Sequence, residues 1–582
     1  MRRFARHGLW LLAFLAMSCT TTTTTTTIPE LTVDEKIGQL FAPDAYGVYM
    51  NETSWAYKRL DHFVREQHVG GFVWFSANVY ETAMLNKRLQ AASKIPLLIS
   101  ADLESGIGMR MADTTFWPPA MAVAATGDPS FAERQGRATA IEAKALGINH
   151  ILAPVADVNV DPDNTVINTR SYGEDPKDVA RYVAAFVRGV RGEGVLATAK
   201  HFPGHGDTHV DSHRSLPVLN VTRERLNEVE LIPFRAAIDA GVDAVMIGHL
   251  AVPALDPTLA QARRDGVREN RYADVSEAPK NATLPATLSH TIIQDLLRKD
   301  LGFRGLVVTD AFDMGGLTDY FDAGEAAVRA IEAGEDQILM PSDADAAIAG
   351  VKAAVKSGRI PMSRIDESVK RILDAKSRVS HDVAGSEEIF RIVDSEESRD
   401  LANEIATKAL TLVRLEQGAL PLKKDARVLE LVISDFNESS NPLAELDRDL
   451  RTRLSTAPQV VMLDAHSWDP KPAIEAAGNA DVVLIALAVR VRSGAGQIAV
   501  PEVARQVIGQ LASMNVRKIG VSFGTPYLLR EVPSLPTYIC AYGRQPVLQA
   551  AVSRALFGET KFTGHLPVTI PGFYQRGFGI TQ

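Results

Sequence analysis

The stretch from Lys200 to Pro217, KHFPGHGDTHVDSHRSLP, concentrates side chains that can bind a metal ion or transfer a proton. Its histidines and aspartates are His201, His205, Asp207, His209, Asp211 and His213. A zinc site needs three or four such ligands at fixed positions, whereas Pro203, Gly204 and Gly206 make this segment a turning loop. None of the usual ligand spacings, such as H-E-x-x-H, is present, so we favour proton transfer over metal binding.

Asp211 and His213 stand two residues apart, which places both side chains on one side of an extended backbone. A carboxylate bonded to one ring nitrogen fixes the tautomer of a histidine and stabilises its imidazolium form. The other nitrogen is then a general acid and base that works near neutral pH. Asp310, in VVTDAFDMGG, follows an apolar run and is a candidate nucleophile for the same reaction. Its alternative role is to cap the helix that follows.

The elements that must position these residues form a repeating pattern between residues 30 and 380. Short apolar runs alternate with stretches of helical spacing, such as Phe131–Leu146, Pro176–Glu193 and Arg223–Ala240. The runs are QLFAPDA, GGFVWFS, PLLISADLE, ILAPVADV, ATAKHFP, AVMIGHL, GLVVTDA and QILMPS. Apolar strands that alternate with helices indicate a parallel sheet, and this number of units predicts a (β/α)8 TIM-type barrel.

Most of these runs end in polar residues, which is where a barrel of this kind places its chemistry. The residues are Asp102, Glu104, Asp157, Lys200, His201, His249 and Asp310. A long polar stretch at 251–284 is either a flap over the site or a solvated excursion. The pattern therefore predicts one site at the carboxyl ends of the strands.

The chain has 582 residues, which is too long for one hydrophobic core, so we expect two large domains. The catalytic barrel spans 30–380, and residues 381–425 predict a helical linker. Residues 426–582 predict a smaller α/β sandwich domain with strands in RVLELVIS, VVMLDA, DVVLIALAV, KIGVSFG and TYICAYG. The formal net charge of −9 and the lack of a basic stripe give no support for nucleic-acid binding.

The N-terminus has the features of a secretory signal, in which arginines precede an apolar run too short to span a bilayer. Residues 1–18 are predicted to be a lipoprotein signal peptide, with Cys19 lipidated; cleavage without lipid is the alternative. The threonine-rich residues 19–29 then form a lipid-anchored tether. We expect anchoring to a bacterial membrane, facing the periplasm or the cell exterior. Cys540, in an apolar run, is expected to be a buried, inert thiol.

The stretch KHFPGHGDTHVDSHRSLP resembles the signature of the β-N-acetylhexosaminidase branch of glycoside hydrolase family 3, in its bacterial two-domain lipoprotein type. Further segments fall in the family's order: DLESGIGMR, NTRSYGEDP, MIGHL, PATLS, GLVVTDAFDMGG and AGEDQILMP. In the second domain LPLKK, VSFGTPYLL and FTGHLPVTIP resemble the family's C-terminal α/β sandwich. The segment DLESG departs from the family pattern at Ser105, where glycine is usual.

The resemblance implies a role for each residue that matches a family motif. Asp310 is the nucleophile that forms a covalent glycosyl intermediate, His213 is the acid/base, and Asp211 is the partner of that histidine. The residues implied to bind the hydroxyl groups of the sugar are Asp102, Arg110, Arg170, Lys200 and His201. The Asp-x-His loop marks the branch that cleaves N-acetylglucosamine, so the second domain need not supply a catalytic group.

The implied activity is that of a retaining exo-β-N-acetylglucosaminidase acting on peptidoglycan fragments or chitooligosaccharides, with no metal or organic cofactor. The nearest alternatives are a β-N-acetylglucosaminide phosphorylase, since some relatives transfer the sugar to phosphate, and a β-glucosidase of the same fold. A more remote alternative is an inactive sugar-binding lipoprotein, which the intact Asp211, His213 and Asp310 disfavour. We expect a monomer whose partners are the carbohydrate and, through its lipid, the membrane.

Overall fold

The computed structural model describes residues 30–582 except 112, 209, 213–214, 261–281 and 490–497. The predicted signal peptide, the lipidation site Cys19 and the tether lie outside the described residues. The predicted acid/base His213 and most of the 251–284 stretch also lie outside them.

The first sheet is a closed parallel barrel with the predicted number of strand units. Its strands are β1 (Phe41–Ala42), β2 (Asp44–Gly47), β3 (Gly71–Ala77), β4 (Leu98–Ala101), β5 (His150–Ile151), β6 (Leu196–Phe202), β7 (Ala244–Ile247), β8 (Leu306–Thr309) and β9 (Ile338–Leu339). Strands β2 to β8 pair in sequence order, and β1 pairs with β9. Only Pro43 separates β1 from β2. The backbone N–H of Thr309 donates to the carbonyl of Gln337, and that of Phe312 donates to the carbonyl of Leu339, so the segments of β8 and β9 are joined and the ring closes.

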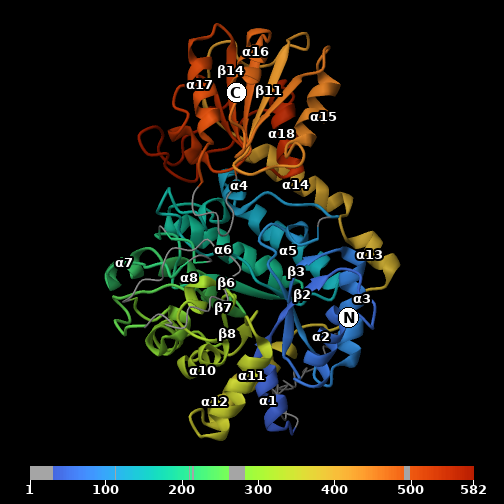
Figure 1. Ribbon diagram of the computed structural model, residues 1–582, viewed down its shortest axis with the longest axis vertical. Coiled ribbons are helices and arrows are strands. Elements are labelled where there is room, and N and C mark those ends of the chain that lie inside the picture. The colour runs from blue at the N-terminus through green and yellow to red at the C-terminus, as the bar shows by residue number, and fades with distance from the viewer. Residues whose placement is uncertain (1–29, 112, 209, 213–214, 261–281, 490–497) are drawn as a thin grey trace, which may run out of the picture.

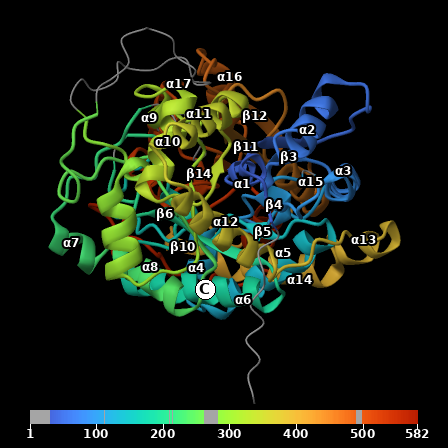
Figure 2. The same ribbon diagram turned by 90° about the horizontal axis from the view of Figure 1, so that it is seen from below.

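Helices surround this barrel, as Figure 2 shows from below. They are α1 (Val33–Gln39), α2 (Trp55–Arg65), α3 (Val79–Ala92), α4 (Ala120–Ala125), α5 (Ser130–Ala145), α6 (Pro176–Gly192), α7 (Arg223–Glu228), α8 (Leu231–Asp239), η4 (Thr291–Asp300), α9 (Gly315–Thr318), α10 (Ala323–Ala333), α11 (Ala344–Lys356) and α12 (Met362–Lys376). Three short 3₁₀ turns are η1 (Ile107–Met109), η2 (Asn168–Arg170) and η3 (Ala286–Leu288). The predicted (β/α)8 barrel is therefore the observed fold of this part of the chain.

The stretch Arg223–Ala240, which has helical spacing in the sequence, is helical in the structure but forms two helices. Helix α7 ends at Glu228 and α8 begins at Leu231. Pro233 explains the break, since a proline has no backbone N–H and its ring clashes with the carbonyl of the residue four positions earlier, here Val229.

The second domain is a sheet of six strands between two layers of helices. Its strands are β10 (Thr411–Arg414), β11 (Val428–Ile433), β12 (Gln459–Leu463), β13 (Val482–Leu487), β14 (Arg517–Ser522) and β15 (Tyr538–Cys540), in the spatial order β10-β15-β14-β13-β11-β12. Its helices are α13 (Ser386–Ile392), α14 (Glu396–Ala409), α15 (Ala444–Arg453), α16 (Lys471–Gly478), α17 (Glu502–Ser513), the 3₁₀ turn η5 (Pro526–Arg530) and α18 (Pro546–Leu556). All pairings are parallel except that of β10 with β15.

Alternate residues of these strands pack on opposite helical layers, which makes the domain an α/β sandwich as predicted. Leu429 and Leu431 share a core with α16 and α17, whereas Val428 and Val432 share one with α15 and α18. The segment 381–425, predicted as a helical linker, holds the helices α13 and α14 and also the short strand β10. Its residues Thr411–Arg414 form the antiparallel edge of the second sheet.

The second domain sits against the end of the barrel at which the polar strand ends lie (Figure 1). Asn159, in the loop after β5, donates a hydrogen bond of 3.0 Å to the Tyr527 hydroxyl. The carboxylate of Glu174 accepts hydrogen bonds from the backbone N–H and the hydroxyl of Thr569 at 2.8 and 2.7 Å. These buried and half-buried polar contacts fix the two domains around a shared cavity.

Candidate active site

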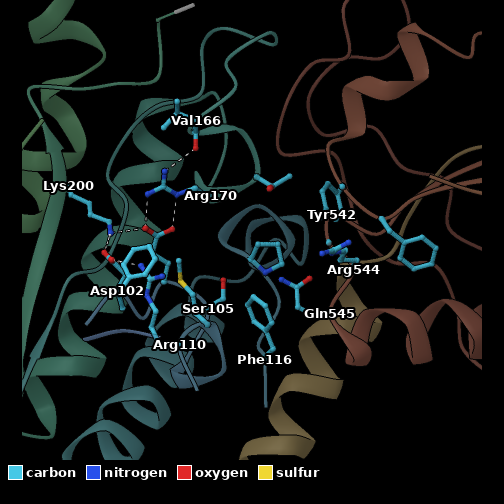
Figure 3. A pocket seen from close by; sticks show the side chains of 18 of the residues that line it. Asp102, Ser105, Arg110, Phe116, Val166, Arg170, Lys200, Tyr542, Arg544 and Gln545 are labelled. Atoms are coloured by element: carbon cyan, nitrogen blue, oxygen red, sulfur yellow. Dashed lines mark hydrogen bonds and ion pairs between the residues drawn. The ribbon is translucent and has the colours of Figure 1, made fainter. Parts of the chain in front are cut away.

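The cavity between the two domains has a volume of about 730 Å³. This volume lies within the range of pockets that bind small molecules. Figure 3 shows Asp102, Arg170 and Lys200 on the barrel side, facing Tyr542 and Arg544 of the second domain. Both sheets therefore direct loops at the carboxyl ends of parallel strands into one site.

A network of five charged side chains forms the barrel wall of the cavity. Lys200 Nζ lies 2.7 Å from Asp102 Oδ1 and 2.7 Å from Glu104 Oε1. Asp102 also accepts a hydrogen bond from Arg110, and Glu104 accepts two from Arg170, at 2.9 and 2.7 Å. Asp102 and Glu104 follow β4 and Lys200 belongs to β6, so the sheet itself brings the opposite charges together.

The electrostatics of this network keep both carboxyl groups ionised. Burial raises the pKa of Asp102, but Lys200 and Arg110 outweigh burial and bring that pKa down to about 2. Burial likewise opposes ionisation of Glu104, and Arg170 and Lys200 hold its pKa well below the ordinary value. The Lys200 side chain is only 2 % exposed, yet it stays charged because Asp102 and Glu104 raise its pKa against the effect of burial. The wall thus presents fixed ionic donors and acceptors to a polar ligand.

A second group of buried polar contacts holds the beginning of the histidine-rich loop. His201 Nδ1 lies 2.7 Å from Asp157 Oδ2, and Asp157 also accepts a hydrogen bond of 2.7 Å from the backbone N–H of His205. The His205 ring bonds to the hydroxyls of Thr208 and Ser212. Burial lowers the pKa of His205 to about 4, so this ring is neutral at pH 7. Asp157 and His205 therefore shape the loop.

Asp310 lies directly after β8 and lines the cavity. Its backbone N–H donates to the carbonyl of Ile247 at 2.9 Å, which continues the pairing of β7 with β8. One carboxylate oxygen accepts a hydrogen bond of 2.8 Å from the backbone N–H of Ala311. This local bond fixes the carboxylate at the strand end. It is not a helix cap, because the next helix, α9, begins at Gly315 with Met314 at its N-cap.

The loop that carries the predicted dyad approaches Asp310 from the segment after β6. Asp211 is 2 % exposed, and its carbonyl accepts a hydrogen bond from the Ser215 backbone N–H. Ser212 lines the cavity, and its carbonyl accepts a hydrogen bond of 3.0 Å from the Gly316 backbone N–H. Ser212, which precedes His213, is thus tied to the segment that follows Asp310.

The structure brings most of the predicted site residues together. The ones that line the cavity are Asp102, Arg110, Arg170, Lys200, His201 and Asp310. Glu104 and Asp157 also stand at strand ends, where the sequence alone indicates no role for them, although Glu104 contacts both Arg170 and Lys200. The lining also includes Glu438, Arg544 and Gln545 of the second domain, which no sequence pattern indicated.

No group of three or more histidine, cysteine, aspartate or glutamate residues is arranged to hold a metal ion in the part of the chain that the structure describes. His209 and His213 lie outside that part. Over the same described ranges, none of the helices combines the length and the apolar character that crossing a bilayer requires.

The fold and the site define a two-domain barrel protein with a charged, small-molecule-sized cavity at the strand ends. Residues 32–375 match the model of the glycosyl hydrolase family 3 N-terminal domain, and the chain belongs to this family of glycoside hydrolases. It is 31 % identical to a β-N-acetylglucosaminidase/β-glucosidase of Cellulomonas fimi, over 93 % of this chain and 94 % of that protein.

Solved structures show the same similarity. A family 3 β-N-acetylglucosaminidase of Paenibacillus sp. str. FPU-7 has a TM-score of 0.79 at 33 % identity, covering 93 % of this chain and 99 % of that one. The β-glucoside phosphorylase BglX has a TM-score of 0.80 at 28 % identity, covering 93 % and 95 %. The predicted family membership is therefore confirmed.

Proposed function

We propose that the protein is a retaining exo-β-N-acetylglucosaminidase that removes terminal β-linked N-acetylglucosamine from peptidoglycan fragments or chitooligosaccharides. The observation that carries this proposal is the largely buried network of Asp102, Glu104 and Lys200, which lines the same cavity as Asp310. Charged, fixed donors and acceptors of this kind suit the hydroxyl groups of a single sugar. The names of the relatives from Cellulomonas fimi and Paenibacillus support N-acetylglucosamine as that sugar.

In the first step, a carboxylate oxygen of Asp310 attacks the anomeric carbon while the bond to the leaving oxygen breaks. The His213 imidazolium gives its proton to that oxygen, and Asp211 stabilises the imidazolium beforehand. In the second step, water gives a proton to His213 and attacks the anomeric carbon, which releases Asp310 and the sugar with retained configuration. Asp102, Arg110, Arg170, Lys200 and His201 hold the sugar throughout.

Phosphate in place of water is the second candidate, because the structural relative BglX is a β-glucoside phosphorylase. A neutral or cationic histidine, unlike a glutamate, does not repel an incoming phosphate anion. The measurement that separates the candidates is release of nitrophenol from 4-nitrophenyl β-N-acetylglucosaminide and β-glucoside by EDTA-treated protein, with and without phosphate. Turnover of the first sugar, indifferent to EDTA and phosphate, is expected. Stimulation by phosphate with a sugar 1-phosphate product would assign a phosphorylase instead.

Two substitutions test the assigned roles. Asp310→Ala is expected to abolish turnover while the protein still folds, because this strand-end carboxylate is not part of the core. His213→Ala is expected to slow turnover by about 10²–10⁴-fold, and by less for nitrophenyl substrates, whose leaving group needs little protonation. Wild-type activity of purified Asp310→Ala protein would show that the site is assigned wrongly.

The cellular placement is a further part of the proposal. Residues 1–18 are a lipoprotein signal peptide, Cys19 carries lipid, and residues 19–29 tether a catalytic barrel that ends near 380. The protein then acts as a monomer on the periplasmic or outer side of a bacterial membrane. Radiolabelled palmitate incorporation that Cys19→Ala removes, with the protein in the membrane fraction, is the expected result. Release of the wild-type protein into the soluble fraction would contradict it.

A further inference from the structure

The second sheet reverses its strand order next to the cavity. Strand β11 pairs with β12 on one side and with β13 on the other, and the chain then continues through β14 and β15 on the β13 side. In open parallel sheets, ligands bind outside the carboxyl ends of the strands where the order reverses in this way. The loop at 434–443, which follows β11, leaves from this point and reaches the cavity.

Two charged side chains meet there from loops far apart in the sequence. Glu438 comes from the loop after β11, and Arg544 comes from the loop after β15. Arg544 Nη1 donates to Glu438 Oε1 at 2.8 Å, and both side chains line the cavity. The side chains are 27 % and 15 % exposed, so the pair is held by the protein but remains open to a ligand.

Buried contacts hold this pair in position. Gln549, which is 3 % exposed, donates to the carbonyl of Arg544 at 2.6 Å and accepts from the backbone N–H groups of Glu445 and Leu446 at 3.1 Å. It thereby joins the loop after β15 to the start of α15. Ser434 donates a further hydrogen bond of 3.1 Å to Glu438. A pair held this firmly from both loops loses little freedom when a ligand binds.

The pair lies across the cavity from the sugar-binding network, as Figure 3 shows for Arg544 opposite Asp102 and Arg170. If a sugar is held at the network with its anomeric carbon at Asp310, the leaving group has to occupy the remaining space toward the second domain. We propose that Arg544 and Glu438 form the subsite that recognises the leaving group, and that this group is an uncharged saccharide. The inference rests on the proposed glycosidase function.

The charges of the site favour an uncharged leaving group over an anionic one. Arginine supplies several donors and glutamate supplies acceptors, which together match hydroxyl groups that both donate and accept. The charges of the two partners cancel. Among the lining residues that the structure describes, the carboxylates outnumber the cations by one: Asp102, Glu104, Asp310, Asp313 and Glu438 against Arg110, Arg170, Lys200 and Arg544. This part of the lining therefore offers a carboxylate or phosphate on the leaving group no net attraction.

The test compares leaving groups on one glycone. For the full-length wild type and Arg544→Ala, kcat/KM is measured with N,N′-diacetylchitobiose, with 4-nitrophenyl β-N-acetylglucosaminide, and with N-acetylglucosaminyl-β-1,4-N-acetylmuramic acid, whose leaving group carries a carboxylate. Arg544→Ala is expected to lower the ratio of chitobiose to nitrophenyl turnover at least tenfold, mainly through KM, because nitrophenol offers little to a guanidinium. Arg544→Lys should recover only part of this ratio, since an ammonium lacks the planar fork.

A matched control is Arg453→Ala, which removes an arginine of the same domain that pairs with Glu559 away from the cavity. It should leave kcat/KM for chitobiose and for the nitrophenyl substrate within twofold of wild type. If the ratio of kcat/KM for chitobiose to kcat/KM for the nitrophenyl substrate stays within twofold of wild type in Arg544→Ala, the inference is overturned. The same holds if kcat/KM falls equally for the two substrates. A larger loss for the muramic acid substrate than for chitobiose would assign an anion site instead. If the wild type cleaves only glucosides, the proposed function fails, and the same comparison is made with cellobiose and nitrophenyl glucoside.

Discussion

Glu104→Gln is the most direct test of the charged wall, because the change keeps the shape of the side chain and removes one charge. Glu104 is 7 % exposed and holds Arg170 through two hydrogen bonds and Lys200 through a third contact. Removing one partner of a buried ion pair typically costs about 3–5 kcal/mol. We expect about 3 kcal/mol here, near the lower limit, because Asp102 still faces Lys200 and the amide oxygen still accepts one hydrogen bond.

The same substitution should reduce activity more than it reduces the population of folded protein. Without its two hydrogen bonds to the Glu104 carboxylate, Arg170 can shift. A displacement of about 1 Å can lower the rate about 10²-fold. We therefore expect a fall in kcat/KM of about 10²-fold for 4-nitrophenyl β-N-acetylglucosaminide, measured where circular dichroism shows the variant fully folded. Urea unfolding of the same sample gives the loss of stability.

Glu133→Gln is the matched control for this experiment. Glu133 pairs with Arg188 on the surface, where the side chains are 40 % and 54 % exposed. The same chemical change there should alter stability by less than about 0.5 kcal/mol and leave kcat/KM unchanged. If Glu104→Gln behaves like the control in both assays, the charged network does not position the site, and the argument from its geometry is wrong.

Two further predictions concern the second domain. Burial, helped by the nearby Asp447, raises the pKa of Glu430 to about 8. On unfolding, this group regains its ordinary pKa of 4.5. The wild type should therefore lose stability as the pH rises above 4.5, because the unfolded state then ionises more readily than the folded state. Glu430→Gln should therefore match the wild type near pH 4.5 and exceed it by about 3 kcal/mol in urea unfolding at pH 7; a constant difference across this range would refute the assignment. Cys540 is fully buried, and burial raises the pKa of its thiol, so a thiol-specific reagent should label it only after denaturation.

The barrel was predictable from the sequence because its strands are short apolar runs bounded by polar residues, a local pattern that burial on both faces requires. The broken helix at Val229 also had a local signal in Pro233, which the periodicity concealed. Strand β10 had no comparable signal. It has four residues, and it is a strand because it pairs with β15, more than 120 residues later. The sequence around β10 indicates helices, which the structure has in α13 and α14, but it does not indicate the strand.

The same distinction between local and distant signals separates the two sides of the cavity. Polar residues at strand ends indicated the barrel side, although the link from Glu104 to Arg170 spans 66 residues and only the fold reveals it. Glu438 and Arg544 are 106 residues apart, and neither stands in a pattern that indicates binding. Their meeting depends on the strand order of the second sheet, which a single sequence does not specify.

This arrangement separates two requirements that a glycosidase has to meet. The chemistry needs groups fixed to a fraction of an ångström, and the barrel supplies them on or beside buried strands, as with Lys200 in β6. Recognition of the leaving group needs contacts that can change without disturbing the reaction, and loops supply these more readily than strands do. Because Glu438 and Arg544 lie on loops of a separate sheet, substitutions there can alter the preferred leaving group while the network at Asp102 stays intact. The second domain would then contribute specificity even though it carries no proposed catalytic residue.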